Sequence, residues 1–326
     1  MENHSEIQKF KNIREIQAIV KGLNKRSKIK FIDVAKSLNV SRHTFHKKLK
    51  SLIQENIINK FTINIHPYIQ PFNLRFMIVE IKTNPKEPRL VQELLKIHQL
   101  KSLDGIFGEF SLIAILVFKS NSDYYNTLRK IDLIMAKSYF KKYQILEPIK
   151  IFKINGITLR KIPINKNNIM IDEIDRMILD ILEYNQGTNP ISTYEIKDII
   201  KIKFKRQVSQ PTIYNRIRAM EENGIILNYA LNFNPRKIGY RGKFIVRIKP
   251  KDPSKYEELA HVLEEKEEII DLFRIGEQFG LFAIVRVKEI EDYGTFIKKL
   301  YEEDIEDTFT NFVLDEIVSF TNFVLF

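Results

Sequence analysis

Residues 42–50 combine basic and apolar side chains at a spacing that suits a DNA-contacting helix. Phe45, Leu49 and Leu52 stand at positions i, i+4 and i+7, which places them on one buried helix face. The opposite face then carries side chains that can reach phosphates and base edges, namely Arg42, His43, His46, Lys47 and Lys50. Arg and Lys favour guanine O6 and N7 in the major groove. The plainer interpretation is a solvated basic helix face without a ligand.

A second segment offers different chemistry at the same relative positions. Moving the chain by 168 residues places Ser41-x-x-Thr44 on Ser209-x-x-Thr212. The outer residues of the second segment are Gln210, Tyr214, Asn215 and Arg218. Asn and Gln suit adenine, so the two helices are expected to prefer different half-sites. The candidate DNA-contact set also includes the residues of the two helix starts, Ser41, Thr44, Ser209 and Thr212.

The same offset of 168 residues relates much of the rest of the chain. Ile57-Ile58 falls on Ile225-Ile226, and Gly108-Glu109 falls on Gly276-Glu277. Such agreement at turn and cap positions predicts two copies of one unit, joined at a polar seam over residues 157–168.

Each copy is expected to contain a helical part followed by a sheet. Apolar spacing over residues 12–57 predicts three short helices, with Ser41 as the N-cap of the third. Alternation at residues 57–65 and 225–233 predicts strands, or wings. The remainder of the first copy predicts the order βαββαβ, with its last strand over residues 142–152. The fold class is therefore α+β, with two winged helix-turn-helix domains (1–65 and 168–233) and two ferredoxin-like domains (66–160 and 234–326).

Charge is distributed unevenly between the copies. The chain carries a formal net charge of +12 over 326 residues. Residues 1–65 hold 14 basic and 5 acidic side chains, and residues 66–165 hold 16 and 8. Residues 166–232 hold 9 of each, and residues 233–326 hold 14 and 19. The ferredoxin-like domains thus carry opposite net charges, which favours their pairing within one chain and predicts a pseudo-dimer.

Several classes of chemistry have no support in the sequence. The chain contains no cysteine, which excludes disulfides and Cys-ligated zinc and fits a reducing compartment. His43 and His46 have no nearby carboxylate to complete a metal site. No Ser/His/Asp set, phosphate-binding loop or dinucleotide-binding glycine motif is present. We expect a cytoplasmic protein that is not an enzyme, with no cofactor, metal or membrane association.

The sequence resembles the leucine-responsive regulatory protein/AsnC, or feast-famine, transcription regulators. The resemblance rests on Val40-Ser41-x-x-Thr44, on Val208-Ser209-Gln-Pro-Thr212 and on Glu222-Asn-Gly-Ile225, and it covers nearly the whole chain twice. It implies binding of double-stranded DNA, a possible small-molecule effector and self-association. Relatives usually have one such unit that dimerises, whereas two diverged units lie here in one chain.

The turns that bind an effector in this family are altered. The family carries Gly-x-x-Asp there, but this chain has Gly108-Glu109-Phe-Ser111 and Gly276-Glu277-Gln-Phe-Gly280. An amino group entering a buried site needs an anion or several carbonyls to replace its water. Glu109 and Glu277 could supply the anion only by turning inward, and the plainer interpretation is that both are solvated turn residues. We therefore expect weak or no binding of ordinary amino acids.

A different function remains open on the same fold. Siroheme decarboxylases look like this family, also pair two units, and use basic and histidine side chains in the ligand domain. This chain offers Arg75, Arg241 and Arg247 near the corresponding strand but no histidine on those strands. At the C-terminus, the apolar residues 320–326 must be covered, and we expect them to add a strand at an interface.

Overall fold

The chain divides into two units that each draw on both halves of the sequence. The computed structural model describes residues 2–24, 30–69, 74–84, 86–162 and 171–325. The helical unit comprises residues 1–66, 160–239 and 320–326, and the sheet unit comprises residues 67–159 and 240–319. Most of the predicted seam, at residues 163–170, lies outside the described residues. The chain therefore passes between the units at residues 66–67, 159–160, 239–240 and 319–320.

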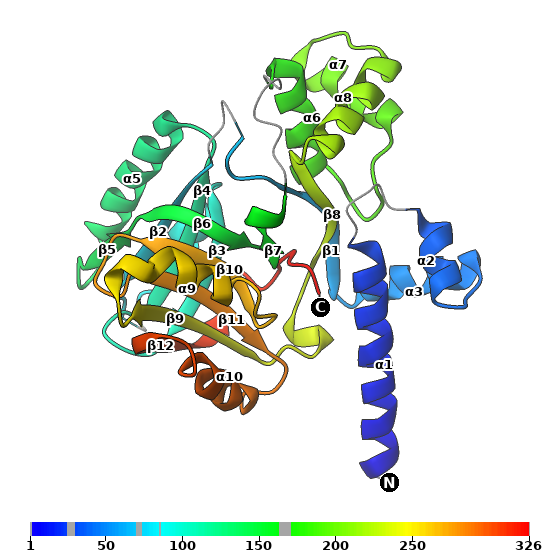
Figure 1. Cartoon of the computed structure of the whole chain (residues 1–326). Coiled ribbons are helices and arrows are strands. Elements are labelled where there is room, and N and C mark those ends of the chain that lie inside the picture. The colour runs from blue at the N-terminus through cyan, green and yellow to red at the C-terminus, as the bar shows by residue number, and fades with distance from the viewer. Residues whose placement is uncertain (1, 25–29, 70–73, 85, 163–170, 326) are drawn as a thin grey trace. The chain divides into compact units, whose positions relative to one another are not determined.

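Six helices of the helical unit form two groups of three (Figure 1). They are α1 (Glu2–Leu23), α2 (Phe31–Ser37), α3 (Arg42–Gln54), α6 (Glu173–Tyr184), α7 (Thr193–Phe204) and α8 (Gln210–Glu222). The predicted face of α3 is buried, since Phe45, Leu49 and Leu52 are at most 6% exposed. All three helices of the first group were expected to be short, but α1 spans 22 residues.

A two-stranded antiparallel ribbon joins the two groups of helices. It consists of β1 (Ile58–Ile65), which follows α3, and β8 (Ile226–Phe233), which follows α8. The short helix η2 (Arg236–Ile238) comes after β8. Both strands are buried along most of their length, on both faces. The ribbon is therefore part of the core of this unit.

The C-terminal tail is covered, but it does not form the expected strand. It makes a single bridge between Thr321 and Phe233, and Phe323 then packs its ring 5.1 Å from that of Phe233. Beyond this bridge, the Phe323 carbonyl accepts from the Asn24 side chain at 3.0 Å.

The sheet unit repeats the order βαββαβ. The first copy contains β2 (Arg75–Ile81), α4 (Pro88–Leu95), β3 (Leu100–Ile106), β4 (Leu112–Phe118), α5 (Asn121–Met135), β5 (Tyr143–Leu146), β6 (Pro148–Ile154), β7 (Ile157–Thr158) and η1 (Leu159–Lys161). The second contains β9 (Gly242–Pro250), η3 (Pro253–Lys255), α9 (Tyr256–Leu263), β10 (Ile269–Ile275), β11 (Leu281–Val287), α10 (Asp292–Leu300) and β12 (Ile305–Glu316). The fold is α+β with antiparallel sheets. The strand order is β5-β2-β4-β3-β12-β9-β11-β10-β6-β7.

The two copies exchange their last strands. Residues 305–312 of β12 pair with β9 of the same copy, and residues 313–316 pair with β3 of the other copy. In the first copy, β5 pairs with β2, whereas β6 pairs with β10 of the second copy. The single strand predicted over residues 142–152 is thus wrong. It breaks at Glu147, just before Pro148, whose nitrogen cannot donate to a ladder, and there the chain leaves β2 for β10.

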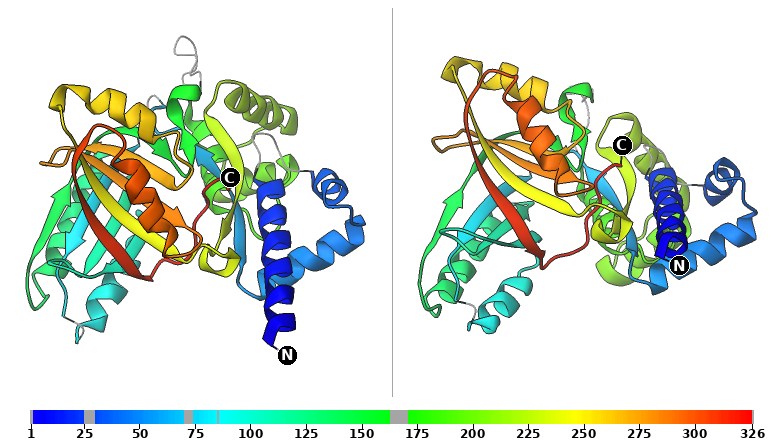
Figure 2. Two further views of the ribbon diagram at one scale, coloured as in Figure 1. Left: turned by 60° about the horizontal axis from the view of Figure 1, so that its bottom comes forward. Right: turned by 90° about the horizontal axis from the view of Figure 1, so that it is seen from below.

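Each copy has its own apolar core under its own helices. One core gathers residues of β2, β3, β4, α4 and α5, and the other gathers residues of β9, β10, β11, α9 and α10. The right-hand view of Figure 2 shows the two pairs of helices, cyan to teal and gold to orange, on opposite outer sides of the strands.

Charged pairs are buried where the two copies meet inside the sheet unit. The Lys243 Nζ lies 2.7 and 2.8 Å from the two carboxylate oxygens of Asp104, and both side chains are at most 4% exposed. Arg247 pairs with one oxygen of the buried Glu80, and Lys101 lies 3.5 Å from the buried Asp271. Burial raises the pKa of Asp104 and lowers that of Lys101. Each of these pairs joins one copy to the other.

Candidate nucleic-acid interface

The start of α3 is fixed by its capping residue. The Ser41 Oγ accepts a hydrogen bond from the Thr44 backbone N–H at 3.1 Å and lies 2.9 Å from the Thr44 Oγ1. This satisfies one of the free N–H groups of the first turn and sets where the helix begins. Arg42 and His43 therefore stand on the first turn with their side chains exposed.

Basic side chains on the outer face of α3 are free to bind an anion. Arg42, Lys47 and Lys50 are exposed, and within the described residues none of them has an acidic partner. They can meet phosphates without first breaking an ion pair. The first candidate helix thus presents exposed, unpaired cations within the described residues, and such cations attract phosphates.

His46 is the exception among the predicted outer residues of α3. Its ring is half-buried, with its centroid 5.3 Å from Phe31 of α2 and 6.3 Å from Phe45. The prediction of an outer position was made from α3 alone, and α2 covers that edge of the helix. His46 therefore helps to hold α2 on α3. In the described part of the chain, no three His, Asp or Glu side chains gather as metal ligands.

The start of α8 repeats the geometry of α3. The Ser209 Oγ accepts from the Thr212 backbone N–H at 3.2 Å and lies 2.7 Å from the Thr212 Oγ1. Tyr214 and Asn215 are exposed on the following turn. The Gln210 side chain instead donates to the Thr193 Oγ1 at 2.8 Å, which ties α8 to α7. Of the predicted contacts, Tyr214 and Asn215 are the most accessible to a base.

Both arginines of α8 already have acidic partners. Arg218 donates from Nε to the Glu222 carboxylate at 2.7 Å, and both side chains are exposed. Arg216, a basic residue of this segment that was not among the predicted DNA contacts, contacts Asp172 at 2.7 Å and Asp175 at 3.0 Å. Asp172 and Asp175 also form the capping box at the start of α6. Arg216 therefore fastens α8 to α6, and only the three-dimensional contact identifies this role.

The ribbon holds the two candidate helices at its opposite ends. Ile58, near the end of α3, pairs with Phe233, whereas Ile65 pairs with Ile226, near the end of α8. The strands run antiparallel, so α3 and α8 are separated along the ribbon by its length. Seven residue steps of about 3.4 Å correspond to about 24 Å.

The first predicted effector turn lies at the surface of the sheet unit. Gly108 has a φ of +142° and is exposed between β3 and β4. Glu109 points to Lys142, whose Nζ lies 2.6 Å from its carboxylate, and this ion pair lowers the pKa of Glu109. Its carboxylate is therefore a surface group and does not turn inward.

The second predicted effector turn is filled by an arginine of the chain itself. Arg274 stacks on Tyr256 at 3.6 Å and donates to the carbonyls of Ile275 and Gly280 at 2.9 and 2.7 Å. Gly280 has a φ of +82°, and a Cβ there would lie 2.2 Å from the Arg274 Nη1. Glu277 accepts from the Phe279 backbone N–H at 3.2 Å, beside the exposed Gly276. Arg274 thus occupies the space inside this turn.

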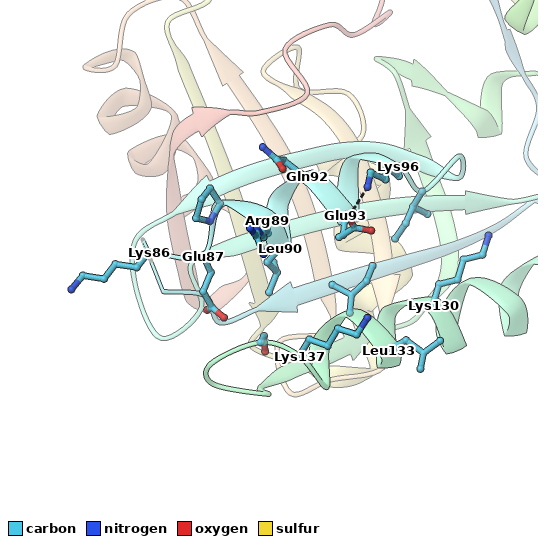
Figure 3. A pocket seen from close by; sticks show the side chains of 14 residues that line it. Lys86, Glu87, Arg89, Leu90, Gln92, Glu93, Lys96, Lys130, Leu133 and Lys137 are labelled. Carbon is cyan, nitrogen blue, oxygen red and sulfur yellow. Dashed lines mark hydrogen bonds and ion pairs between the residues drawn. The ribbon is translucent and has the colours of Figure 1, made fainter.

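A groove of about 1130 Å³ lies between α4 and α5 (Figure 3). On one side it is lined by Arg89 and Leu90 of α4 and by Lys96, which follows that helix. On the other side it is lined by Lys130 and Leu133 of α5 and by Lys137, two residues after that helix. Lys96 pairs with Glu93, and Lys86 points away from the groove. The groove contains none of the site residues predicted from the sequence.

The three arginines of the tetrapyrrole alternative all have acidic partners. Arg75 pairs with Glu147 and lies over the Tyr124 ring at 4.0 Å. Arg241 lies 3.1 Å from Glu289, and Arg247 pairs with the buried Glu80. The structure does not bring the three arginines together as one set of free cations.

Comparisons with known proteins find similar chains. Residues 243–323 match the Lrp/AsnC ligand binding domain. The chain is 32% identical over 133 residues to the HTH-type transcriptional regulator Ptr1 of Methanocaldococcus jannaschii, covering 40% of this chain and 83% of that protein. It is 34% identical over 128 residues to the HTH-type transcriptional regulator LrpA of Pyrococcus abyssi, covering 39% of this chain and 84% of that protein. Each relative thus corresponds to less than half of this chain.

One solved structure is similar over almost the whole chain. It is the siroheme decarboxylase NirDL in complex with an iron-uroporphyrin III analogue, with a TM-score of 0.58 and 13% identity. The similarity covers 94% of this chain and 92% of that one, and at this identity it concerns the fold alone. Over the described residues, no helix is long and apolar enough to cross a membrane. On the similarity to Ptr1 and LrpA and the matched ligand domain, the chain belongs to the Lrp/AsnC family of HTH-type transcriptional regulators.

Proposed function

We propose that the protein is a sequence-specific, double-stranded DNA-binding transcription regulator with two non-identical reading helices. The observation that carries this proposal is the pair of Ser-capped helices, α3 and α8, at opposite ends of one ribbon. Helix-turn-helix proteins place two such helices in successive major grooves, so that half-site spacing follows from the protein. The regulators among its relatives support the same function.

In this proposal each group of three helices with its ribbon strand is a winged helix-turn-helix domain. The domains span residues 1–65 and 168–233, and the two βαββαβ copies are ferredoxin-like domains over residues 66–160 and 234–326. The short connection from α2 to α3 through Asn39 and the Ser41 cap supports the first assignment. The element order of the sheet unit supports the second.

One chain would then do the work of a dimer. The buried pairs explain why unlike copies pair, because the offset of 168 places Glu80 on Ile248 and Val79 on Arg247. Two first copies would leave Glu80 facing Val79, and two second copies would leave Arg247 facing Ile248. A buried charge without its partner is strongly destabilising. Separately expressed copies should therefore form a mixed complex in light scattering, and stable homodimers alone would contradict the pseudo-dimer.

Selection of binding sites from random duplexes tests the main proposal. The enriched sites should contain two unlike half-sites at one spacing, because α3 presents Lys47 and Lys50 where α8 presents Asn215 and Arg218. A perfectly palindromic consensus would contradict the non-identical heads. No enrichment over random sequence would contradict sequence-specific binding itself.

The effector and assembly of this regulator are separate proposals. Glu109 is engaged at the surface and Arg274 fills the second turn, so neither turn offers an inward carboxylate to an amino acid. We expect calorimetric titration with the twenty amino acids to give weak or no binding. A micromolar hit abolished by Gly276→Trp would show that these turns bind an amino acid. Further self-association of pseudo-dimers is expected in light scattering at rising concentration.

The similarity to NirDL supports one alternative, a fused tetrapyrrole enzyme on this fold. The ion pairs of Arg75, Arg241 and Arg247 count against it, since a tetrapyrrole carboxylate would have to displace an acidic side chain from each. Titration with siroheme decides the matter. A saturable Soret shift would favour the enzyme, and its absence together with duplex binding would favour the regulator.

A further inference from the structure

Four asparagines form one hydrogen-bonded chain through the centre of the helical unit. Asn64 of β1 and Asn228 of β8 are direct cross-strand partners, and the Asn64 Nδ2 donates to the Asn228 Oδ1 at 2.8 Å. Asn228 donates in turn to the side chain of Asn24, just after α1. Asn322 of the C-terminal tail donates to the Asn64 Oδ1 at 2.7 Å. We call these four residues the asparagine ladder.

Three of the four ladder residues are buried and Asn322 is half-buried, so water cannot replace the hydrogen bonds among the buried three. Asn24, Asn64 and Asn228 are all at most 8% exposed. Asn24 also donates to the Phe323 carbonyl at 3.0 Å, so the ladder binds the tail at two points. A buried amide without a partner costs free energy that an exposed one does not, because solvent satisfies the exposed group.

The apolar pattern of the ribbon leaves its register open. When one face of a strand is buried, a one-residue slip turns apolar side chains to solvent, and this fixes the register. Residues 61–64 of β1 and 226–231 of β8 are buried without alternation, so that argument is weak here. A slip by two residues would keep the faces but separate the amides of Asn64 and Asn228. A buried polar pair can therefore specify what the apolar pattern does not.

The register of this ribbon decides how far apart the two reading helices lie. Because α3 and α8 precede opposite ends of antiparallel strands, a slip changes their separation along the ribbon. A two-residue slip moves them by about 7 Å, and B-DNA rises about 3.4 Å per base pair. Such a slip therefore corresponds to about two base pairs of half-site spacing.

We propose that the asparagine ladder fixes the β1–β8 register and thereby determines the spacing between the two DNA half-sites. The spacing part rests on the proposed function, whereas the register part does not. Asn64 and Asn228 are the positioning residues of this device, and Asn322 supports them from the tail.

A second asparagine pair on the same ribbon provides a matched control. The Asn59 Nδ2 donates to the Asn232 Oδ1 at 3.2 Å, but Asn59 is exposed and Asn232 is half-buried. Water can replace their hydrogen bond in any register. The double change Asn59→Val/Asn232→Val should therefore leave the register intact, in contrast to Asn64→Val/Asn228→Val, which has the same chemistry in a buried place.

The first experiment measures the register without DNA. The natural chain has no cysteine, so Ser51→Cys on α3 and Ala219→Cys on α8 give two unique, exposed labelling sites. Pulsed electron spin resonance should give one narrow distance distribution for the natural ribbon and for the exposed control. The buried double variant should give a broad or multiple distribution while circular dichroism still reports a folded chain. A single unchanged distance in that folded variant overturns the proposal.

The second experiment measures spacing on DNA. Selection from duplexes with variable spacers should give one spacer length for the natural chain, with lengths two base pairs away disfavoured roughly tenfold or more. The buried double variant should enrich lengths that differ by two base pairs to similar extents. An unchanged sharp optimum in a folded variant contradicts the ladder's role. If the natural chain enriches no duplex, the proposed function fails, and the spin-label result still decides the register.

If the buried double variant does not fold, the tail gives a milder test. Asn322→Ala removes one donor to Asn64 and leaves both strands unchanged. It should broaden the label distances less than the buried pair does, but more than the control pair. A distribution identical to that of the natural chain would remove the tail from the device.

Discussion

The two candidate DNA-binding helices, α3 and α8, begin with the same Ser cap but differ in the charge that they present. Lys47 and Lys50 of α3 correspond to Asn215 and Arg218 of α8 at the offset of 168. On α3 both lysines are exposed and have no acidic partner in the described part of the chain. On α8, Arg218 forms an ion pair with Glu222, and Asn215 is uncharged. If the proposed function holds, this difference predicts that α3 contributes mainly phosphate attraction and α8 mainly base discrimination.

The largest effect should be a loss of stability at low pH, caused by a difference between the residues that follow the two ribbon strands. His66 follows β1, is 2% exposed, and burial lowers its pKa to about 4, whereas its counterpart Asn234 does not titrate. Because the folded-state pKa lies below the unfolded-state value of about 6.5, the neutral His66 ring is compatible with the folded state at pH above 6.5. The free energy of unfolding then decreases as pH falls from 6.5 towards 4. The unfolding free energy should drop by about 3 kcal/mol over that window. Denaturant unfolding at each pH measures it.

His66→Gln provides the control for this pH dependence. The glutamine cannot titrate, so its curve should lack the drop between pH 6.5 and 4. Identical pH dependence in both chains would mean that other groups carry the effect.

The next effect concerns the two arginines of α8. Arg216→Ala leaves the Asp175 carboxylate, which is 10% exposed, without its cation, and should cost about 2 kcal/mol of stability. Arg218→Ala removes only an exposed pair, which is worth about 0.5 kcal/mol or less. Thermal unfolding of the two variants measures the contrast. Equal melting temperatures would show that Arg216 does not hold α8 on α6.

Neutralising α3 should weaken binding to every duplex. Lys47→Ala/Lys50→Ala removes two phosphate partners, so affinity should fall roughly tenfold and the salt slope should become shallower by about 1.8. Fluorescence anisotropy on specific and random duplexes over a salt series measures both. Lys130→Ala/Lys137→Ala removes the same charge from the α4–α5 groove. If this control produced the same slope change, the effect would come from net charge and not from α3.

The smallest effect should be confined to one base pair. Asn215→Ala should lose about 1 kcal/mol of preference at one position of one half-site and leave random-duplex affinity unchanged. A loss of affinity that is equal on all sequences would assign Asn215 to the backbone and erase the distinction between the heads.

Much of the secondary structure could be predicted from the sequence because it depends on neighbours in the chain. The apolar spacing of Phe45, Leu49 and Leu52 and the Ser41 and Ser209 caps act within one helix. The break before Pro148 was missed although proline is a local signal, because the alternating residues on both sides resemble one strand. Its cause is a change of partner strand, and the partner is distant in sequence.

The sequence by itself determined that two copies of an α+β unit, with unequal charge, occupy one chain. Helical periodicity and caps depend on neighbouring residues, and the repeat is recognised by comparing the sequence with itself. Only the tertiary structure decided that the copies exchange strands, that His46 packs on Phe31, and that Asn64 meets Asn228. The repeat obscured that last contact, since the offset of 168 places Asn64 on Asn232. A hydrogen bond between distant residues depends on register and burial, and neither is encoded in the spacing of residues along one strand.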